Sequence, residues 1–262
     1  MATGKQSKVE RAREARAARK RSRERFMQAR RVTKTFERQL RGVAEQVGRI
    51  VSGFAPKGIV KDISVLRDAL HQYSQVLRPW AQAVSEQMLA QVAQRDSTAW
   101  IELGRDIGHE LREELRRADM REALKQLQDE QVELITSLPV KAAERVHKLA
   151  VEAHVSGARA AEVAKEIMRT GAVTKSRAML IARTEVSRTG TAITEQRAAA
   201  LGSTGYIWRT AGDSDVRHTH KKLEGKFIEW NNPPIAGSNG ERAHAGAIYN
   251  CRCWPEPVLP DV

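Results

Sequence analysis

The sequence predicts a mainly α protein, with a long helical N-terminal region followed by a small α+β C-terminal domain. Only 5% of the 262 residues are aromatic and 29% are charged, which argues against one compact core over the whole length. From Val43 to about Leu201, apolar residues recur at helical spacing, and after Gly202 short apolar runs alternate with Gly, Pro and Asn. We therefore expect a basic arm at 1–41, an elongated helical region at 42–156 and an α+β domain at 157–262.

Residues 1–41 carry most of the net charge. Their fifteen Lys or Arg and four Glu account for eleven of the thirteen net positive charges. Ala, Arg and Glu form helices well, but there is little apolar surface to bury, so we expect an arm that is partly disordered or helical. The charge fits a solvated helix face, but its density favours binding to a polyanion. DNA contacts are expected from Arg11, Arg13, Arg16, Arg19, Lys20, Arg21, Arg23, Arg25, Arg30 and Arg31.

The region 42–156 is typical of amphipathic helices whose apolar stripes pack against one another. Residues 55–58, Ala-Pro-Lys-Gly, mark the first break between helices. Pro79 predicts a boundary, with this proline in the first turn of the next helix. Residues 96–98 offer caps for a helix that begins near Trp100. Pro139 predicts another break, because proline inside a helix removes a backbone hydrogen bond.

The C-terminal half changes from helices to strands and loops. A hinge is expected at 156–157, because Ser156 and Gly157 interrupt the helical pattern. The pattern then predicts, in order, a helix at 160–168, a turn at Gly171, a helix from 174 to 201 and strands at 206–210 and 226–230.

Both cysteines and three of the five tryptophans lie after position 200, near a run of Asp, Arg and His. Cys251 and Cys253 are too close in sequence for an unstrained disulfide, and two cysteines cannot form an extracellular disulfide framework. One interpretation is a zinc site made by His218, His220 and the two cysteines, with His244 as a further candidate. The Cys-x-Cys spacing is tighter than in common zinc motifs, which counts against that interpretation.

Two other interpretations fit the same residues. In a hydrolase or nuclease, His220 would act as general acid or base while Arg217 or Arg252 stabilises an anionic transition state. No nucleophile–base motif accompanies them. In a structural module, Asp213 would cap a turn, Arg217 would pair with a carboxylate such as Glu185, and the cysteines would pack as small apolar residues.

Three motifs occur in order along the C-terminal half. They are Arg183-Thr184-Glu185, the segment from Asp213 to Gly225 with Arg217, His220 and Leu-Glu-Gly, and the closing Asn250-Cys251-Arg252-Cys253. Together they resemble the phage Mu F-like minor head proteins, also called phage head morphogenesis proteins, over about residues 155–258. Some members of that family carry Cys-x-x-Cys where this chain has Arg217 and His220, and arginine is not an ordinary zinc ligand.

The resemblance implies a non-enzymatic virion component inside the capsid near the portal, acting in head assembly or in DNA packaging or ejection. Its implied partners are portal, capsid or scaffold proteins and DNA without sequence preference, and its implied location is the virion, with the host cytoplasm during assembly. The chain has no apolar run that suits a membrane anchor.

The expected site is a polar network rather than a catalytic centre. Its members are Arg183, Thr184, Glu185, Asp213, Arg217, His220, Gly225, Asn250, Cys251, Arg252 and Cys253. No cofactor is expected, and zinc on His220, Cys251 and Cys253 remains the alternative.

Overall fold

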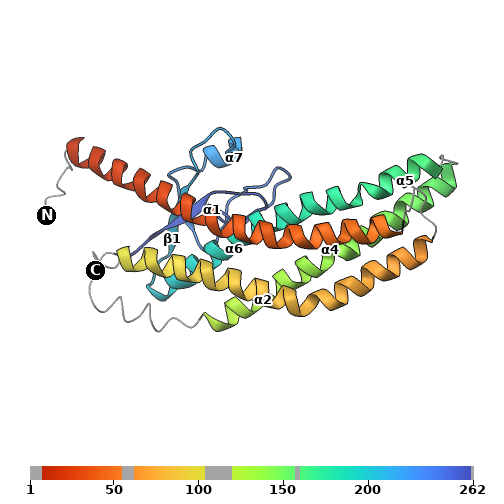
Figure 1. The fold of residues 1–262 in the computed structure, drawn as a ribbon. Helices are drawn as coiled ribbons and strands as arrows, with labels where there is room; N and C mark the ends of the chain where they lie inside the picture. Colours follow the sequence, from red (N-terminus) through yellow and green to blue (C-terminus); the bar gives the residue numbers. More distant parts are fainter. Residues whose placement is uncertain (1–7, 55–61, 104–119, 157–159, 261–262) are drawn as a thin grey trace.

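The computed structural model describes residues 8–54, 62–103, 120–156 and 160–260, and it confirms the mainly α fold with a small α+β C-terminal region (Figure 1). The helices are α1 (Lys8–Gly53), α2 (Ile63–Leu103), α4 (Arg121–Ser156), α5 (Ala160–Met168), α6 (Thr170–Ala200) and the short α7 (His218–Lys221). The strands are β1 (Gly205–Arg209), β2 (Phe227–Glu229) and β3 (Trp254–Val258). The helix predicted at 160–168 and the strands predicted near 206 and 226 are thereby confirmed.

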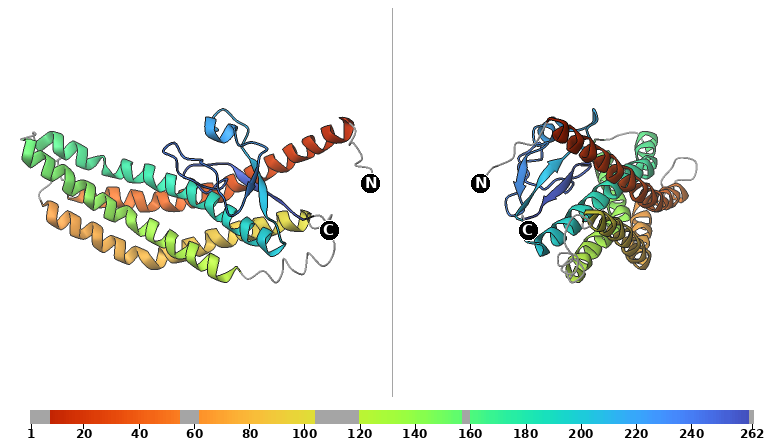
Figure 2. Two further views of the ribbon diagram at one scale, coloured as in Figure 1. Left: turned by 180° about the vertical axis from the view of Figure 1, so that it is seen from behind. Right: turned by 90° about the vertical axis from the view of Figure 1, so that its left-hand side faces the viewer.

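Helices α1, α2, α4 and α6 lie side by side in an elongated bundle, and α5 lies at the end far from the sheet (Figures 1 and 2). Buried side chains from all four helices form its central core, including Leu40, Val84, Ile135 and Ile181. A second core nearer α5 includes Val47, Leu70 and Ile167. None of the helices in the described part of the chain has the length and hydropathy of a membrane span.

Helix α1 joins the basic N-terminal segment to this bundle without a break. Its N-terminal part extends beyond the other helices, as the red ribbon in Figure 1 shows. Phe36 and Leu40, which lie within the segment 1–41, are almost fully buried in the central core. The end of the basic segment is therefore anchored by apolar packing, whereas the part that follows Lys8 extends outward on the same helix.

Two predicted helix boundaries are wrong, because Pro79 lies inside α2 and Pro139 inside α4. A proline inside a helix costs about 3 kcal/mol, so packing must outweigh its lost hydrogen bond. Pro79 is exposed, which leaves the freed carbonyl group of that turn accessible to water. Five residues before Pro79, Ser74 Oγ donates a hydrogen bond of 2.8 Å to the carbonyl of Thr136, which lies three residues before Pro139 and so links α2 to α4.

Two further sequence predictions are corrected by the helix bounds. Residues 96–98 lie inside α2 rather than capping a new helix near Trp100. Gly171 lies in the first turn of α6 rather than in a turn before it. It meets Gly48 of α1, and a Cβ atom on Gly171 would lie 3.0 Å from the Gly48 Cα atom. This glycine therefore serves a close helix crossing. The break predicted at 55–58 and the Gly157 side of the predicted hinge lie outside the described residues.

The three strands form an antiparallel sheet in the order β2-β1-β3. Gly205 pairs with Glu229 on one side and with Val258 on the other, so β1 is the central strand. The sequence analysis did not predict β3, because Pro255 and Pro257 are typical of a loop rather than of a strand. Prolines suit an edge strand, where the missing N–H groups point away from the sheet.

A small core joins this sheet to the loops around it. Tyr206 and Trp208 of β1 are fully buried and pack with Ala245, Cys251 and Cys253. We refer to residues 205–258 as the sheet module. Figure 2 shows it on one side of the bundle, where β3 contacts α6.

We expect Gly171→Val to lower the free energy of unfolding by about 1–3 kcal/mol, because the new side chain meets the Gly48 backbone and forces α1 and α6 apart. The matched control is Gly42→Val in α1, where an added Cβ atom meets nothing within 4 Å. Urea denaturation of both variants measures the difference. Equal stabilities would contradict a tight crossing at Gly171.

Candidate functional site

A row of hydroxyl side chains on α6 holds the sheet module. Thr184, Ser187 and Thr191 lie on one face of the helix, because residues three and seven positions apart share a face. Their partners, in that order, are the N–H of Asn250, which donates to Thr184 Oγ1, and the carbonyls of Cys251 and Ala245, at 3.0, 3.0 and 2.6 Å. The segment 245–251 is thus fixed to α6 through its main chain.

Backbone conformation explains two residues of this segment. Gly246 has a φ of 87°, and a Cβ atom there would lie 2.7 Å from Thr191 Oγ1 and 2.8 Å from the Cys253 carbonyl. Asn250 has a φ of 53°, a left-handed conformation that asparagine tolerates better than most residues. The same reasoning explains Gly225, whose φ is 75° and whose N–H donates to the Trp208 carbonyl at 2.9 Å.

The Arg183-Thr184-Glu185 motif points in three directions, since successive helical residues differ by about 100° around the axis. Arg183 Nε donates to Glu37 Oε1 of α1 at 2.7 Å. Thr184 contacts the sheet module as described above. Glu185 is 3% exposed and faces the bundle interior. One short motif therefore touches α1, the sheet module and the bundle core.

Burial is the main influence on Glu185, and it raises the pKa of this carboxyl group above its ordinary value. Arg188 lies 4.0 Å away and acts in the opposite direction, while the nearby Glu130 adds to the increase. Arg188 makes its shorter ion pair, 2.6 Å, with Glu130. Glu185 is therefore a buried acid whose charge is only partly compensated.

Loops 213–217 and 249–252 are joined by two arginines. Arg252 donates two hydrogen bonds to the carboxylate of Asp213, both 2.7 Å, in the bidentate geometry that favours Arg over Lys. Arg217 donates to the Tyr249 carbonyl at 3.0 Å and lies 5.5 Å from the centre of the Tyr249 ring. Arg217 thus contacts Tyr249 rather than Glu185, which was the partner suggested from the sequence.

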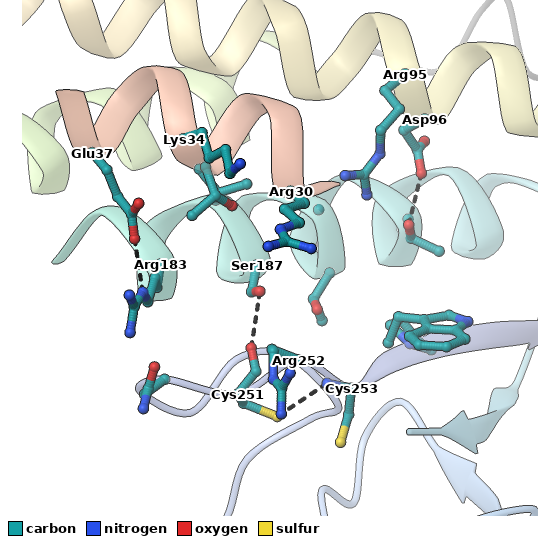
Figure 3. Close-up of a pocket in the computed structure, with 18 of the residues that line it drawn as sticks. Arg30, Lys34, Glu37, Arg95, Asp96, Arg183, Ser187, Cys251, Arg252 and Cys253 are labelled. Atoms are coloured by element: carbon teal, nitrogen blue, oxygen red, sulfur yellow. Dashed lines mark hydrogen bonds and ion pairs between the residues drawn. The ribbon is translucent and has the colours of Figure 1, made fainter. Parts of the chain in front are cut away.

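Between α1, α2, α6 and the segment 250–255 lies a pocket of about 740 Å³ (Figure 3). Its lining contains cationic and anionic side chains in similar numbers, namely Arg30, Lys34, Arg95, Arg183 and Arg252 with Glu37, Asp96, Asp213 and Asp215. Among these side chains, Arg183 forms an ion pair with Glu37 and Arg252 forms one with Asp213. This balance is unlike the one-sided cationic groove that a nucleic-acid strand needs.

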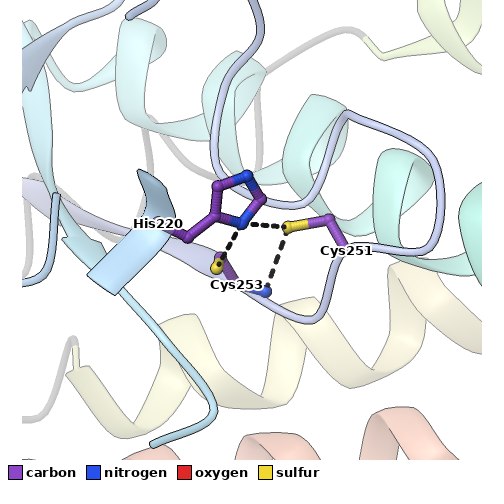
Figure 4. A group of neighbouring side chains, drawn as sticks. All are labelled: His220, Cys251 and Cys253. Atoms are coloured by element: carbon purple, nitrogen blue, oxygen red, sulfur yellow. Dashed lines mark hydrogen bonds between the residues drawn. The ribbon is translucent and has the colours of Figure 1, made fainter. Parts of the chain in front are cut away.

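His220, Cys251 and Cys253 meet in the interior of the sheet module (Figure 4). His220 is 2% exposed. Its Nδ1 atom lies 3.5 Å from Cys251 Sγ and 3.4 Å from Cys253 Sγ, and its Nε2 atom lies 3.1 Å from the Ala236 carbonyl. The Cys253 N–H donates to Cys251 Sγ at 3.4 Å. We call these three residues the His-Cys-Cys cluster.

The two thiols share their protons unequally. A hydrogen bond from the Cys253 thiol is the largest influence on Cys251, and together with the Cys253 N–H it outweighs burial and lowers the pKa of Cys251 to about 4. The pKa of Cys253 is raised, because its proton is held against the Cys251 sulfur and because the group is buried. The pair therefore favours one thiolate, centred on Cys251.

The structure separates the predicted network into three groups. Asp213, Arg217, Asn250 and Arg252 form the loop contacts, His220 lies with the cysteines, and Arg183 and Glu185 face the bundle. A DNA phosphate could not reach the buried His220 without rearrangement, so the geometry does not favour this residue as a surface general base. Among the predicted DNA contacts, Arg30 and Arg31 are exposed on α1, and the side chains of residues 8–29 lie outside the described part.

Sequence reasoning missed Ser187 and Thr191, which anchor the sheet module. Their spacing with Thr184 was the available signal, because hydroxyl residues at one face of a helix can bind a neighbouring main chain. It also missed the buried pair of Asp96 in α2 and Arg197 in α6, to which Thr194 adds a hydrogen bond of 2.7 Å.

Comparison with known proteins confirms the resemblance stated from the motifs. Residues 144–255 match the family described as Phage Mu protein F like protein. An uncharacterized protein of Haemophilus influenzae is 33% identical over 128 residues, which are 49% of this chain. The matched region spans only 28% of that protein's length. No solved structure matches the chain.

We expect Glu185→Gln to raise stability at neutral pH by about 1 kcal/mol, because it removes the cost of a buried charge. The folded protein's raised pKa means that wild-type stability falls as pH rises from the unfolded to the folded pKa of Glu185. In Glu185→Gln, the free energy of unfolding should no longer fall over this pH range, because glutamine does not ionise. Chemical denaturation at several pH values between 4 and 8 measures the free energy of unfolding of the wild type, of this variant and of the control Glu162→Gln, which changes an exposed residue. If Glu185→Gln had the same pH dependence as the wild type, the prediction would be wrong.

Proposed function

From the match of residues 144–255 to the phage Mu F-like family, we propose that this protein is a phage head morphogenesis protein, a minor structural component of the virion. In this proposal it lies inside the capsid near the portal and acts in head assembly or in DNA packaging or ejection. Its protein partners would be portal, capsid or scaffold subunits. The family match is the observation on which the proposal depends.

The division of the molecule supports this role. Helix α6 contacts the sheet module on one face and the bundle core on another, so a contact on the module would be transmitted to the bundle. The basic N-terminal part of α1 extends beyond that body (Figure 1). A protein that docks on a head component with one part and presents a basic helix with another suits a location beside packaged DNA.

DNA contact through this helix would be independent of sequence. Lys and Arg contacts to phosphates gain free energy by releasing counterions, and charge alone does not read bases. The balanced charges of the pocket make α1 the better candidate for this contact. Residues 1–41 carry eleven of the thirteen net positive charges of the chain.

We expect neutralisation of the outer arm to weaken binding to random DNA and to make it less dependent on salt. The variant changes eight residues to Gln and leaves the buried Phe36 and Leu40 intact: Arg11, Arg13, Arg16, Arg19, Lys20, Arg21, Arg23 and Arg25. The slope of log K against log salt should fall in magnitude by about 0.9 for each phosphate that the variant no longer neutralises. Fluorescence anisotropy at several salt concentrations measures both quantities.

The control removes the same number of charges from the exposed surface of the bundle and sheet module. It changes Lys141, Lys148, Arg169, Lys175, Arg177, Lys221, Lys222 and Lys226 to Gln. The two variants have equal net charge, so a difference between their salt slopes reports the location of the DNA-binding surface. Equal slopes would contradict a DNA-binding arm.

We expect the protein to be retained in phage heads. Particles formed in cells that express a tagged copy would be purified on a density gradient and treated with protease before mass spectrometry. Protected peptides from both the bundle and the sheet module should be present in heads. Their absence from heads, with abundant protein elsewhere in the lysate, would contradict a virion location.

A further inference from the structure

We propose that the His-Cys-Cys cluster binds one zinc-class divalent cation, through His220 Nδ1, Cys251 Sγ and Cys253 Sγ. The three ligand atoms lie within 4.8 Å of one another and are buried. They come from two separate segments, α7 and the loop before β3, so the ion would connect parts of the module that are distant in sequence.

The distances between the ligand atoms fit a tetrahedral site. Zn–S bonds of about 2.3 Å and Zn–N bonds of about 2.0–2.1 Å place nitrogen and sulfur about 3.5 Å apart. The observed separations of His220 Nδ1 from the two sulfurs are 3.5 and 3.4 Å. The two nitrogen–sulfur separations therefore match those that a bound ion requires, and all three ligand atoms lie within 4.8 Å of one another.

The hydrogen bond of His220 to the main chain determines which ring nitrogen carries the proton and which one is free to bind a metal. Nε2 lies 3.1 Å from the Ala236 carbonyl, which accepts a hydrogen bond only if this nitrogen carries the proton. Nδ1 then keeps its lone pair, directed at the two cysteines (Figure 4). A metal-binding histidine commonly has this arrangement, with the second nitrogen bonded to a main-chain carbonyl.

The environment of the two sulfur atoms also favours the thiolate form that binds a cation. The Cys253 N–H donates to Cys251 Sγ at 3.4 Å, which stabilises a thiolate. Both cysteines are free, and two thiolates with one neutral imidazole carry the net charge that suits a divalent cation. Soft sulfur and nitrogen ligands favour zinc over magnesium or calcium.

The fourth position would be taken by water. A cavity of about 80 Å³ borders the cluster and is lined by Asp215, Arg217 and Asn250 in addition to the three ligands. This space is large enough for a water molecule and offers it polar partners. Among the described residues, no fourth His, Cys or acidic ligand joins the group.

The function of the ion would be to stabilise the sheet module. Its core is a single small cluster around Tyr206 and Trp208, and small units of this kind often depend on a metal or a disulfide. A bound ion would fix α7 to the segment 251–253, which itself is attached to α6. Removal of the ion would then loosen the module before the bundle.

The test uses the full-length protein, purified under reducing conditions and freed of metal. Cobalt(II) is added in steps, and absorption is recorded from the near ultraviolet to the visible. We expect saturation at one ion per chain, with sulfur-to-cobalt charge-transfer bands and tetrahedral d–d bands. Zinc should displace the cobalt at the same stoichiometry, and the melting temperature should rise when zinc is added to the metal-free protein.

Variants identify the ligands. Cys251→Ser, Cys253→Ser and His220→Gln should each lose stoichiometric binding, whereas His218→Gln should retain it, because His218 is exposed on the same short helix. If a ligand variant does not fold, the wild-type cobalt spectrum decides. A spectrum without thiolate bands, or no binding at micromolar concentrations, would overturn the proposal and would leave the DNA-binding experiment on the arm unaffected.

Discussion

The contact between one face of α6 and the main chain of residues 245–251 determines how the rest of the molecule is arranged. Thr184, Ser187 and Thr191 use side-chain oxygens to satisfy main-chain groups of a segment that has no regular secondary structure. A buried main-chain group without a partner is costly, so the buried Ala245 carbonyl requires the Thr191 hydroxyl that this helix face supplies. The sheet module therefore depends on α6, and α6 depends on the bundle.

This dependence gives α6 two structural roles. On its bundle side it packs through apolar residues such as Ala178 and Ile181, and on its module side it presents small hydroxyl residues. Helix α6 is therefore only weakly amphipathic, because the bundle covers one face and the sheet module covers another. The His-Cys-Cys cluster lies just beyond the hydroxyl row, where Cys251 is held by Ser187 through its main chain and faces His220 through its side chain.

The sequence predicted features that depend on local pattern, such as the helix at 160–168 and the two strands. It failed where tertiary packing overrides a local rule: Pro79 and Pro139 remain inside helices, and Gly171 marks a helix crossing. In the site, the motifs identified the relevant residues but not their partners. Arg183 and Glu185 point to different elements, and only the fold brings His220 to the cysteines.

The two prolines of β3 have a consequence for behaviour at high protein concentration. An edge strand offers unpaired N–H groups with which another chain can form an intermolecular sheet. On β3, Pro255 and Pro257 are in register with the central-strand residues Trp208 and Tyr206, so their missing donors fall on the outer side of the strand. The backbone that completes the sheet therefore lacks outward-pointing donors at these two positions, which disfavours the addition of a strand from another chain at this edge.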